Sequence, residues 1–170
     1  VYWSKFESLY YPGDYAIKDS DGYLWLLGRS DDVLKVAGHR IGTAELESSI
    51  ISHNDVAESA VCGIPDDVKG ESIIAFVVLK ENVHTSDDTL RSELRDTIRT
   101  QIGPIATPSQ FYVVTKLPKT RSGKIMRRLL KSIANNETIG DVSTLEDGAV
   151  VSEIQSTFNE LQKNIQNQKN

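Results

Sequence analysis

Short β-like runs near the N-terminus alternate with turn residues and predict two small hairpins. The segment Asp19-Ser20-Asp21-Gly22 is a turn signal, and it is followed by the apolar run Tyr23 to Gly28. Farther along, apolar residues between positions 33 and 41 flank Gly38. Glycine in such a place indicates a tight connection, so a second hairpin is expected there.

Two segments show the period of an amphipathic helix. The first opens with Glu45 and Glu47, whose charges suit the N-terminal end of a helix dipole. We expect its apolar residues to share one face: Leu46, Ile50 and Ile51. The second runs from Thr85 to Ile102, where apolar residues recur every four positions opposite a charged face. Gly103 and Pro104 end it.

Apolar runs between and after these helices predict three strands, which we place at 56–63, 72–79 and 111–114. A third helix is expected to begin at Lys124, because apolar residues follow at helical spacing: Ile125, Met126, Leu129, Leu130 and Ile133. From Asn135 the chain is polar, with a last amphipathic stretch at 151–161 and a tail expected to be disordered.

This order of elements predicts an α+β fold built on three strands with flanking helices and an N-terminal β-hairpin. We expect residues 1–30 to be a separate, truncated unit, residues 31–135 to form the small domain, and residues 136–170 to be a partly disordered C-terminal extension. The chain begins at Val1 within an aromatic-rich pattern, and we expect it to be part of a longer protein.

Composition narrows the class of protein. The 170 residues carry a net charge of −5, which gives no strong attraction to nucleic acid or an anionic membrane. There is no apolar run long enough for a membrane span and no secretory signal, so a cytoplasmic location, with the nucleus as a second one, is expected. The single cysteine, Cys62, lies in an apolar stretch and is expected to be a buried, inert thiol.

The candidate chemistry lies in the basic segment from Pro118 to Arg128. Thr120, Ser122 and Gly123 are loop and cap residues, so Lys124 is expected on a mobile turn, beside amides able to face an anion. Such an ammonium suits transfer chemistry at a phosphate. A solvated basic helix start is the alternative. A Walker loop is excluded, because Pro118 stands where that motif requires glycine.

Three segments, in order and at matching spacing, carry a family resemblance: Tyr11 to Asp14, Gly28 to Glu47, and the lysine segment. Together they resemble the C-terminal part of the adenylate-forming enzymes, which include acyl-CoA synthetases, adenylation domains and beetle luciferases. The segments Ile102 to Pro108 and Gly140 to Leu145 are similar to the acetyl-CoA synthetase branch. The resemblance implies a mobile C-terminal lid with a three-stranded mixed sheet, preceded by the end of a large N-terminal domain.

The resemblance further implies an acetate–CoA ligase reaction in two steps. Acetate attacks the α-phosphorus of ATP, giving acetyl-AMP and diphosphate, and the thiol of CoA then displaces AMP. ATP, CoA and Mg²⁺ are the implied cofactors, and acetate is the implied substrate. Lys124 matches the catalytic lysine that bridges carboxylate and α-phosphate during the first step. Fixed positive charge is the expected catalytic device, since both transition states are anionic.

Other positions match binding or hinge residues of the family. Asp14 and Arg29 match ribose contacts, and Arg40 matches an arginine near the polyphosphate. The remaining matches are a hinge residue, two positions near CoA and a metal-site residue: Asp31, Gly38, Arg99 and His53 respectively. Ordinary structural roles compete with each of them, such as turn formation for Asp14 or a helix cap for His53.

The phosphate loop, adenine motif and acyl pocket of the family would lie before Val1, so we expect the chain alone to be inactive. Three alternatives stay open. One is a synthetase for propionate or another short acid. Another is a nucleic-acid-binding module or nuclear import signal using the basic stretch, which the acidic balance opposes. The third is a regulatory domain in which Lys124 meets an acetyltransferase and a deacetylase; for this family, such acetylation would switch the enzyme.

Overall fold

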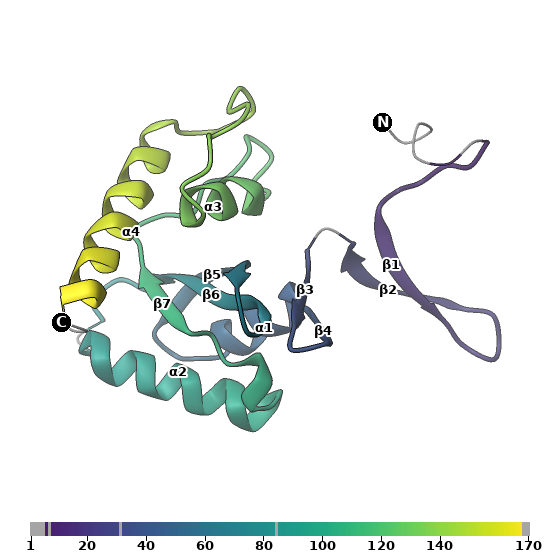
Figure 1. Ribbon diagram of the computed structural model, residues 1–170, viewed down its shortest axis with the longest axis horizontal. Helices are drawn as coiled ribbons and strands as arrows, with labels where there is room; N and C mark the ends of the chain where they lie inside the picture. Colours follow the sequence, from purple (N-terminus) through teal and green to yellow (C-terminus); the bar gives the residue numbers. More distant parts are fainter. Residues whose placement is uncertain (1–5, 7, 31, 84, 168–170) are drawn as a thin grey trace. The chain divides into compact units, whose positions relative to one another are not determined.

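The computed structural model describes residues 6, 8–30, 32–83 and 85–167. The chain divides into two compact units, Val1–Val33 and Leu34–Asn170. Figure 1 shows the elements of both in chain order. The assignment of residues 1–30, 31–135 and 136–170 to functional domains stays a prediction.

The first unit contains the first predicted hairpin. Strand β1 (Asp14–Lys18) pairs antiparallel with β2 (Leu24–Arg29). Asp19 organises the turn, because its carboxylate accepts hydrogen bonds from the Asp21 and Tyr23 amides, at 3.0 and 2.9 Å, and from the Trp25 indole at 2.9 Å. These bonds lower the pKa of Asp19, with the Trp25 bond as the largest cause.

The second unit is built on a mixed sheet. Strand β5 (Val56–Asp66) pairs antiparallel with β6 (Gly70–Leu79), and β7 (Gln110–Val113) lies parallel to β6. This is the predicted three-stranded mixed sheet. The second predicted hairpin, β3 (Val33–Val36) and β4 (His39–Gly42), joins the edge of β6 through the pair Val36 and Gly70. The sheet therefore has five strands when the hairpin is included.

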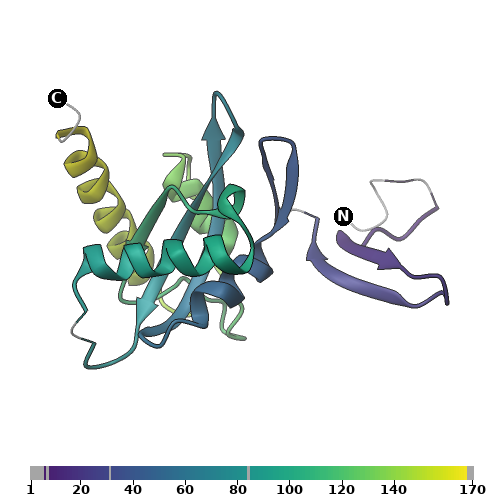
Figure 2. The same ribbon diagram turned by 90° about the horizontal axis from the view of Figure 1, so that it is seen from below.

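Helices cover both faces of this sheet (Figure 2). Helices α1 (Thr43–Ile51) and α2 (Asp87–Gln101) share one hydrophobic cluster, while α3 (Arg127–Ala134) and α4 (Ala149–Asn167) share another. A short 3₁₀ turn, η1 (Pro104–Ala106), follows α2. Ser86 caps α2 by accepting a hydrogen bond from the Thr89 amide, which satisfies an orphan donor of the first turn. The α+β prediction is confirmed.

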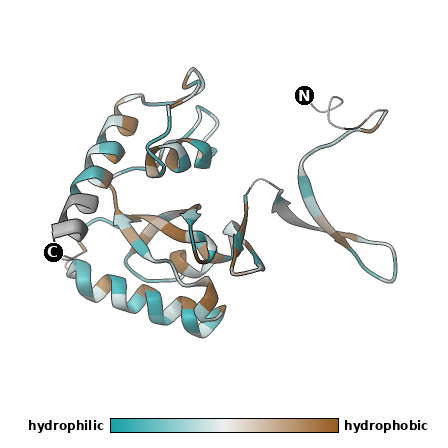
Figure 3. Ribbon diagram, in the orientation of Figure 1, coloured by the Kyte–Doolittle hydropathy of each residue, from teal (hydrophilic) through white to brown (hydrophobic). Residues whose placement is uncertain are grey.

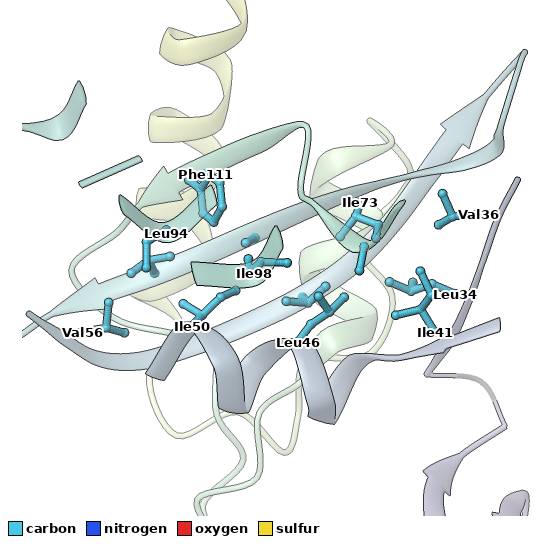
Figure 4. Close-up of a cluster of buried hydrophobic side chains, with 14 of the residues drawn as sticks. Leu34, Val36, Ile41, Leu46, Ile50, Val56, Ile73, Leu94, Ile98 and Phe111 are labelled. Carbon is cyan, nitrogen blue, oxygen red and sulfur yellow. The ribbon is translucent and has the colours of Figure 1, made fainter. Parts of the chain in front are cut away.

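Strand β6 separates the two clusters by simple alternation. Ile73, Ala75 and Val77 enter the α1/α2 cluster, while Ile74 and Phe76 enter the α3/α4 cluster. The strand is apolar from Ile73 to Leu79, because both of its faces are buried along most of this stretch. Figure 3 shows this apolar band along the central strands, and Figure 4 shows the α1/α2 cluster in detail.

Three sequence-based expectations about helices need correction. Ile51 does not share the buried face of Leu46 and Ile50, because the side chain is 44% exposed at the end of α1. Helix α3 begins at Arg127, so Lys124 lies before it. Helix α4 continues to Asn167, beyond the stretch expected to be ordered, and buries Ile154 and Phe158 against the sheet.

Candidate functional site

Lys124 lies on an exposed turn that is closed by hydrogen bonds. The Thr120 amide donates to the Lys124 carbonyl at 2.9 Å, and the Lys124 amide donates to Thr120 Oγ1 at 3.1 Å. Below the turn, Lys119 pairs with Ile125 in a β-bridge, and the Met126 amide donates to the Pro118 carbonyl at 2.8 Å. We call residues 118–126 the lysine turn. It is a short two-stranded stem that ends at the pair Thr120 and Lys124, with residues 121–123 connecting them.

A later segment holds the lysine turn from the side. Thr120 forms a β-bridge with Leu145, which is buried in the α3/α4 cluster. The Arg121 amide donates to the Thr144 carbonyl at 3.2 Å, and the Glu146 amide donates to the Lys119 carbonyl at 2.9 Å. Residues 144–146 lie just before α4, so the polar segment after Asn135 supports the lysine turn.

The expectation that amides beside Lys124 face an anion is not met for most of the turn. The amides of Thr120, Arg121, Gly123 and Lys124 all donate to acceptors within the chain. A helix N-terminus next to Lys124 is also absent in the described residues, because α3 starts three positions later. The cationic chemistry of the turn therefore depends on the exposed Lys124 side chain.

The start of α3 carries an ion pair that the sequence did not reveal. Arg127 Nε lies 2.8 Å from Glu47 Oε1, and Arg127 Nη2 lies 2.5 Å from Glu47 Oε2. Glu47 Oε1 also accepts a hydrogen bond from the Val61 amide at 2.9 Å. Glu47 is only 7% exposed and lies in α1, 80 positions before its partner. No local pattern could have joined these two residues.

Asp14 and Arg29, the two predicted ribose contacts, lie side by side in the first unit. They are paired positions of β1 and β2, and Arg29 Nη1 lies 3.6 Å from Asp14 Oδ1. Arg29 Nη1 also donates to the Pro12 carbonyl at 2.8 Å. Gly13 has φ +79°, and a Cβ there would lie 3.1 Å from Arg29 Nη2, so glycine permits this arrangement. Their ribose roles stay predictions.

Gly38 lies in the turn of the β3–β4 hairpin with φ +83°, next to Ala37 at φ +47°. Two successive positive φ angles are typical of a tight, twist-compatible hairpin turn. A Cβ on Gly38 would meet no atom within 4 Å, so the turn presents open backbone. Arg40 follows on β4 with an exposed side chain. The hairpin buries Leu34 and Ile41 in the α1/α2 cluster, whereas the lysine turn leads into α3.

Arg99 is exposed in the last turn of α2. His53, after α1, uses both ring nitrogens: Nδ1 accepts from the Asp55 amide at 3.2 Å, and Nε2 lies 3.0 Å from Glu93 Oε2. The contact with Glu93 joins the segment after α1 to α2, and the engagement of both ring nitrogens gives no support to a metal at His53, which stays a prediction. Asp31, the predicted hinge, lies outside the described residues.

The described part of the chain offers neither a metal-binding cluster nor a membrane-spanning helix. Within it, no three His, Cys, Asp or Glu side chains come close enough together to hold a metal ion. None of its helices combines the length and apolar character needed to cross a bilayer. Cys62 is buried as expected, and this burial raises the pKa of its thiol to about 12.

Comparison with known proteins gives consistent matches. Residues 45–124 match the family described as AMP-binding enzyme C-terminal domain, and Lys124 is the last residue matched. An acetyl-coenzyme A synthetase of Pyrobaculum aerophilum is 62% identical over 161 residues, which is 95% of this chain and 24% of that protein. A 3-hydroxypropionyl-coenzyme A synthetase of Metallosphaera sedula is 52% identical over 165 residues, 97% of this chain and 25% of that protein.

A solved structure agrees with these sequence matches. The anthranilate CoA ligase AuaEII in complex with anthranoyl-AMP shares 38% identity and a TM-score of 0.66, covering 75% of this chain and 24% of that one. The chain thus spans about a quarter of the length of the relatives it matches. The sequence matches, the α+β fold and the lysine turn agree, and the chain belongs to the adenylate-forming enzymes, of which it carries the AMP-binding enzyme C-terminal domain.

Proposed function

We propose that this chain is the C-terminal lid portion of an AMP-forming acetate–CoA ligase. The complete enzyme would join acetate to ATP, release diphosphate, and then transfer the acetyl group from AMP to the thiol of CoA. The observation that carries the proposal is the exposed Lys124 in a closed turn, inside a segment that matches the AMP-binding C-terminal family. High identity to an acetyl-coenzyme A synthetase supports acetate as the acid.

In the adenylation step, Lys124 would offer a compact ammonium on a long flexible stem. Its role would be to neutralise charge between the attacking carboxylate and the α-phosphate, which is an electrostatic contribution made mainly in the transition state. The rigid stem of the lysine turn supports this role, because it fixes the backbone while leaving the side chain in solvent. ATP would bring Mg²⁺ with its phosphates, and the described residues offer no cluster to hold that ion.

Asp14 and Arg29 would contact the ribose, and a carboxylate can accept hydrogen bonds from both vicinal hydroxyls. Their mutual distance of 3.6 Å supports a joint role, since Arg29 orients the carboxylate. Arg40 would lie near the polyphosphate. Asp31 would be the hinge about which the lid turns between the two steps, so that Lys124 and the Gly38 hairpin act in alternation. Arg99 would contact the nucleotide part of CoA.

The decisive experiment measures ATP–diphosphate exchange in the full-length protein with Lys124→Ala. By analogy with losing an oxyanion-hole donor, exchange should fall at least ~10²-fold, while thioester formation from supplied acetyl-adenylate should change much less. Lys80→Ala is the matched control, since Lys80 is another exposed lysine outside the turn. Exchange that survives intact in Lys124→Ala would remove Lys124 from the mechanism. The isolated chain should show no exchange at all.

Another short acid is an alternative to acetate as the substrate. The close match to a 3-hydroxypropionyl-coenzyme A synthetase favours this alternative, and propionate is a further candidate. Comparing kcat/KM for acetate, propionate and 3-hydroxypropionate in the full-length protein would decide among them. A clear preference for either longer acid would contradict the acetate proposal while leaving the role of Lys124 intact.

The basic stretch gives little support to a nucleic-acid module. Lys119, Arg127 and Lys131 contact the carboxylates of Glu58, Glu47 and Glu71. Arg128 donates to the Asp141 carbonyl. These side chains are engaged within the fold and do not form a free phosphate-tracking stripe. Salt-sensitive binding of the chain to random DNA would revive that alternative.

The exposure of Lys124 also supports acetylation as a switch, because acetylation would remove the charge that adenylation needs. The partners would be a lysine acetyltransferase and a deacetylase. Mass spectrometry that finds Lys124 unmodified in cells lacking deacetylase activity would argue against this. A cytoplasmic location stays a prediction, and a nuclear one gains no support.

A further inference from the structure

We propose that Glu47 is a positioning residue for adenylation, acting through Arg127 on the turn that carries Lys124. The inference rests on the proposed function, because it assigns a role in the same half-reaction. Glu47 contacts neither the lysine turn nor any residue that we assign to substrate binding. Its effect would come from fixing the base of the turn relative to the sheet.

The Glu47 carboxylate is held by strand β5. Glu47 is 7% exposed, and its Oε1 accepts from the Val61 amide on β5, the strand that α1 packs against. Ser59 Oγ donates to the Glu47 carbonyl at 3.1 Å, which ties the backbone of α1 to the same strand. The acid is therefore fixed at both its backbone and its side chain before Arg127 is considered.

Arg127 and Glu47 form a two-point contact. Arg127 Nε and Nη2 address the two oxygens of Glu47 separately, at 2.8 and 2.5 Å. A two-point contact between planar groups fixes orientation as well as distance, which a lysine at position 127 could not do. The Glu47 side chain is 9% exposed and the Arg127 side chain is 23% exposed, so solvent screens the pair less than it would screen a surface ion pair.

Two other directional contacts of α3 lie at the surface: Arg128 Nη2 donates to the Asp141 carbonyl at 2.7 Å, and Lys131 Nζ lies 3.7 Å from Glu71 Oε1. The N-cap residue of α3, Met126, makes no side-chain cap hydrogen bond. Leu129, Leu130 and Ile133 bury the helix against the sheet, but this hydrophobic contact is non-directional. The Glu47–Arg127 pair supplies a directional contact at the first residue of the helix.

The Glu47–Arg127 pair is connected to Lys124 through the stem of the lysine turn. Met126, next to Arg127, closes the stem of the lysine turn by donating to the Pro118 carbonyl. Lys124 is three positions before Arg127, and Ile125, one of the two residues between them, pairs with Lys119 across the stem. A shift at Arg127 is therefore transmitted to the turn. Misplacing a catalytic group by about 1 Å can lower a rate on the order of 10²-fold.

The test uses Glu47→Gln in the full-length protein. The amide nitrogen of glutamine would face the donors of Arg127, so the two-point contact would be lost with little change in volume. We expect kcat for ATP–diphosphate exchange to fall ~10- to 100-fold, with KM for ATP changing little. Thioester formation from supplied acetyl-adenylate and CoA should stay within about threefold of wild type, because Lys124 serves the first step.

Two further variants keep the test decisive. Arg127→Lys retains the charge and removes the two-point contact, so it should reproduce the split between half-reactions even if Glu47→Gln fails to fold. The double variant should lose no more than either single variant, because one interaction is removed in all three. Glu93→Gln is the matched control: it also removes an acid that joins two elements, but its partner is His53.

Equal losses in both half-reactions, or full exchange activity in a folded Arg127→Lys, would overturn the inference. The Lys124→Ala variant distinguishes failure of the positioning role from failure of the proposed function. If Lys124→Ala leaves exchange intact, the proposed function fails. If Lys124→Ala abolishes exchange while the Glu47 and Arg127 variants leave the two half-reactions balanced, only the positioning role fails.

Discussion

Thr120 and Lys124 hold each other through two hydrogen bonds. The Thr120 amide donates to the Lys124 carbonyl at 2.9 Å, and its hydroxyl oxygen accepts from the Lys124 amide at 3.1 Å. The Thr120 carbonyl also accepts from the Gly123 amide at 2.8 Å, where Gly123 has φ +82°. Thr120 thus closes the upper part of the turn that presents the candidate catalytic lysine, and of these three bonds only the one to its hydroxyl oxygen depends on the side chain.

Thr120→Val should test this closure. Valine keeps the shape and the backbone bonds but leaves the Lys124 amide without its side-chain acceptor, at a cost of about 1 kcal/mol. We expect exchange activity to fall about 5- to 10-fold, equivalent to ~1 kcal/mol, since the turn would sample other conformations. Thr120→Ser should retain nearly full activity. Equal activity in the valine and serine variants would show that the hydroxyl does not order the turn.

Local patterns foretold those elements whose determinants are close in sequence. The hairpin of β1 and β2 was predictable because Asp19 and Gly22 mark its turn, and a continuous apolar run marked β6. The start of α3 was misplaced because Ile125 continues a helical spacing, although it pairs with Lys119 in a bridge. Such a bridge depends on the support of residues 144–146, which no local period encodes.

The candidate site divides in the same way. Lys124 and Gly38 were found from motifs, because their chemistry requires particular residues in fixed neighbourhoods. Glu47 was interpreted as an acid that favours a helix start, although it is buried and pairs with Arg127. That role depends on how α1 and α3 approach β5, which is a tertiary arrangement. The position of Glu47 in the helix pattern does not indicate that its partner is Arg127.

Cys62 should remain an unreactive thiol in the folded protein. Burial raises the pKa of Cys62 from 9.0 to about 12, with Lys131 and Glu47 as opposing smaller influences. The thiolate needed for alkylation is therefore scarce between pH 7 and 9. We expect iodoacetamide to label Cys62 slowly in the native protein and rapidly in urea. Rapid native labelling would contradict burial of this side chain.

The same shift predicts a pH dependence of stability. The folded state holds the proton more tightly than the unfolded state, so the stabilisation is complete below pH ~9 and is lost as pH rises toward about 12. Within that window the slope should approach ~1.4 kcal/mol per pH unit. Urea unfolding of wild type and Cys62→Ala at pH 8 and 10.5 would measure it. The stability difference between the two proteins should shrink at the higher pH.

Gly38→Ala should separate the two half-reactions in the opposite sense to Lys124→Ala. At φ +83° an alanine costs about 1 kcal/mol of strain, and its Cβ meets no atom within 4 Å, so the hairpin should still form. If this backbone lies against the pantetheine arm of CoA, the added methyl group should lower thioester formation about tenfold, equivalent to ~1.4 kcal/mol. Adenylation should change little.

Gly70→Ala is the matched control for that experiment. Gly70 has φ +78°, so the backbone strain is similar, and its Cβ would contact the Lys35 carbonyl at 3.6 Å without a clash. It lies at the β5–β6 connection, where we assign no contact to CoA. Both variants should lose similar stability, but only Gly38→Ala should slow the thioester step measured from acetyl-adenylate and CoA. Equal slowing in both would attribute the effect to strain in the sheet edge that Gly70 shares with Val36.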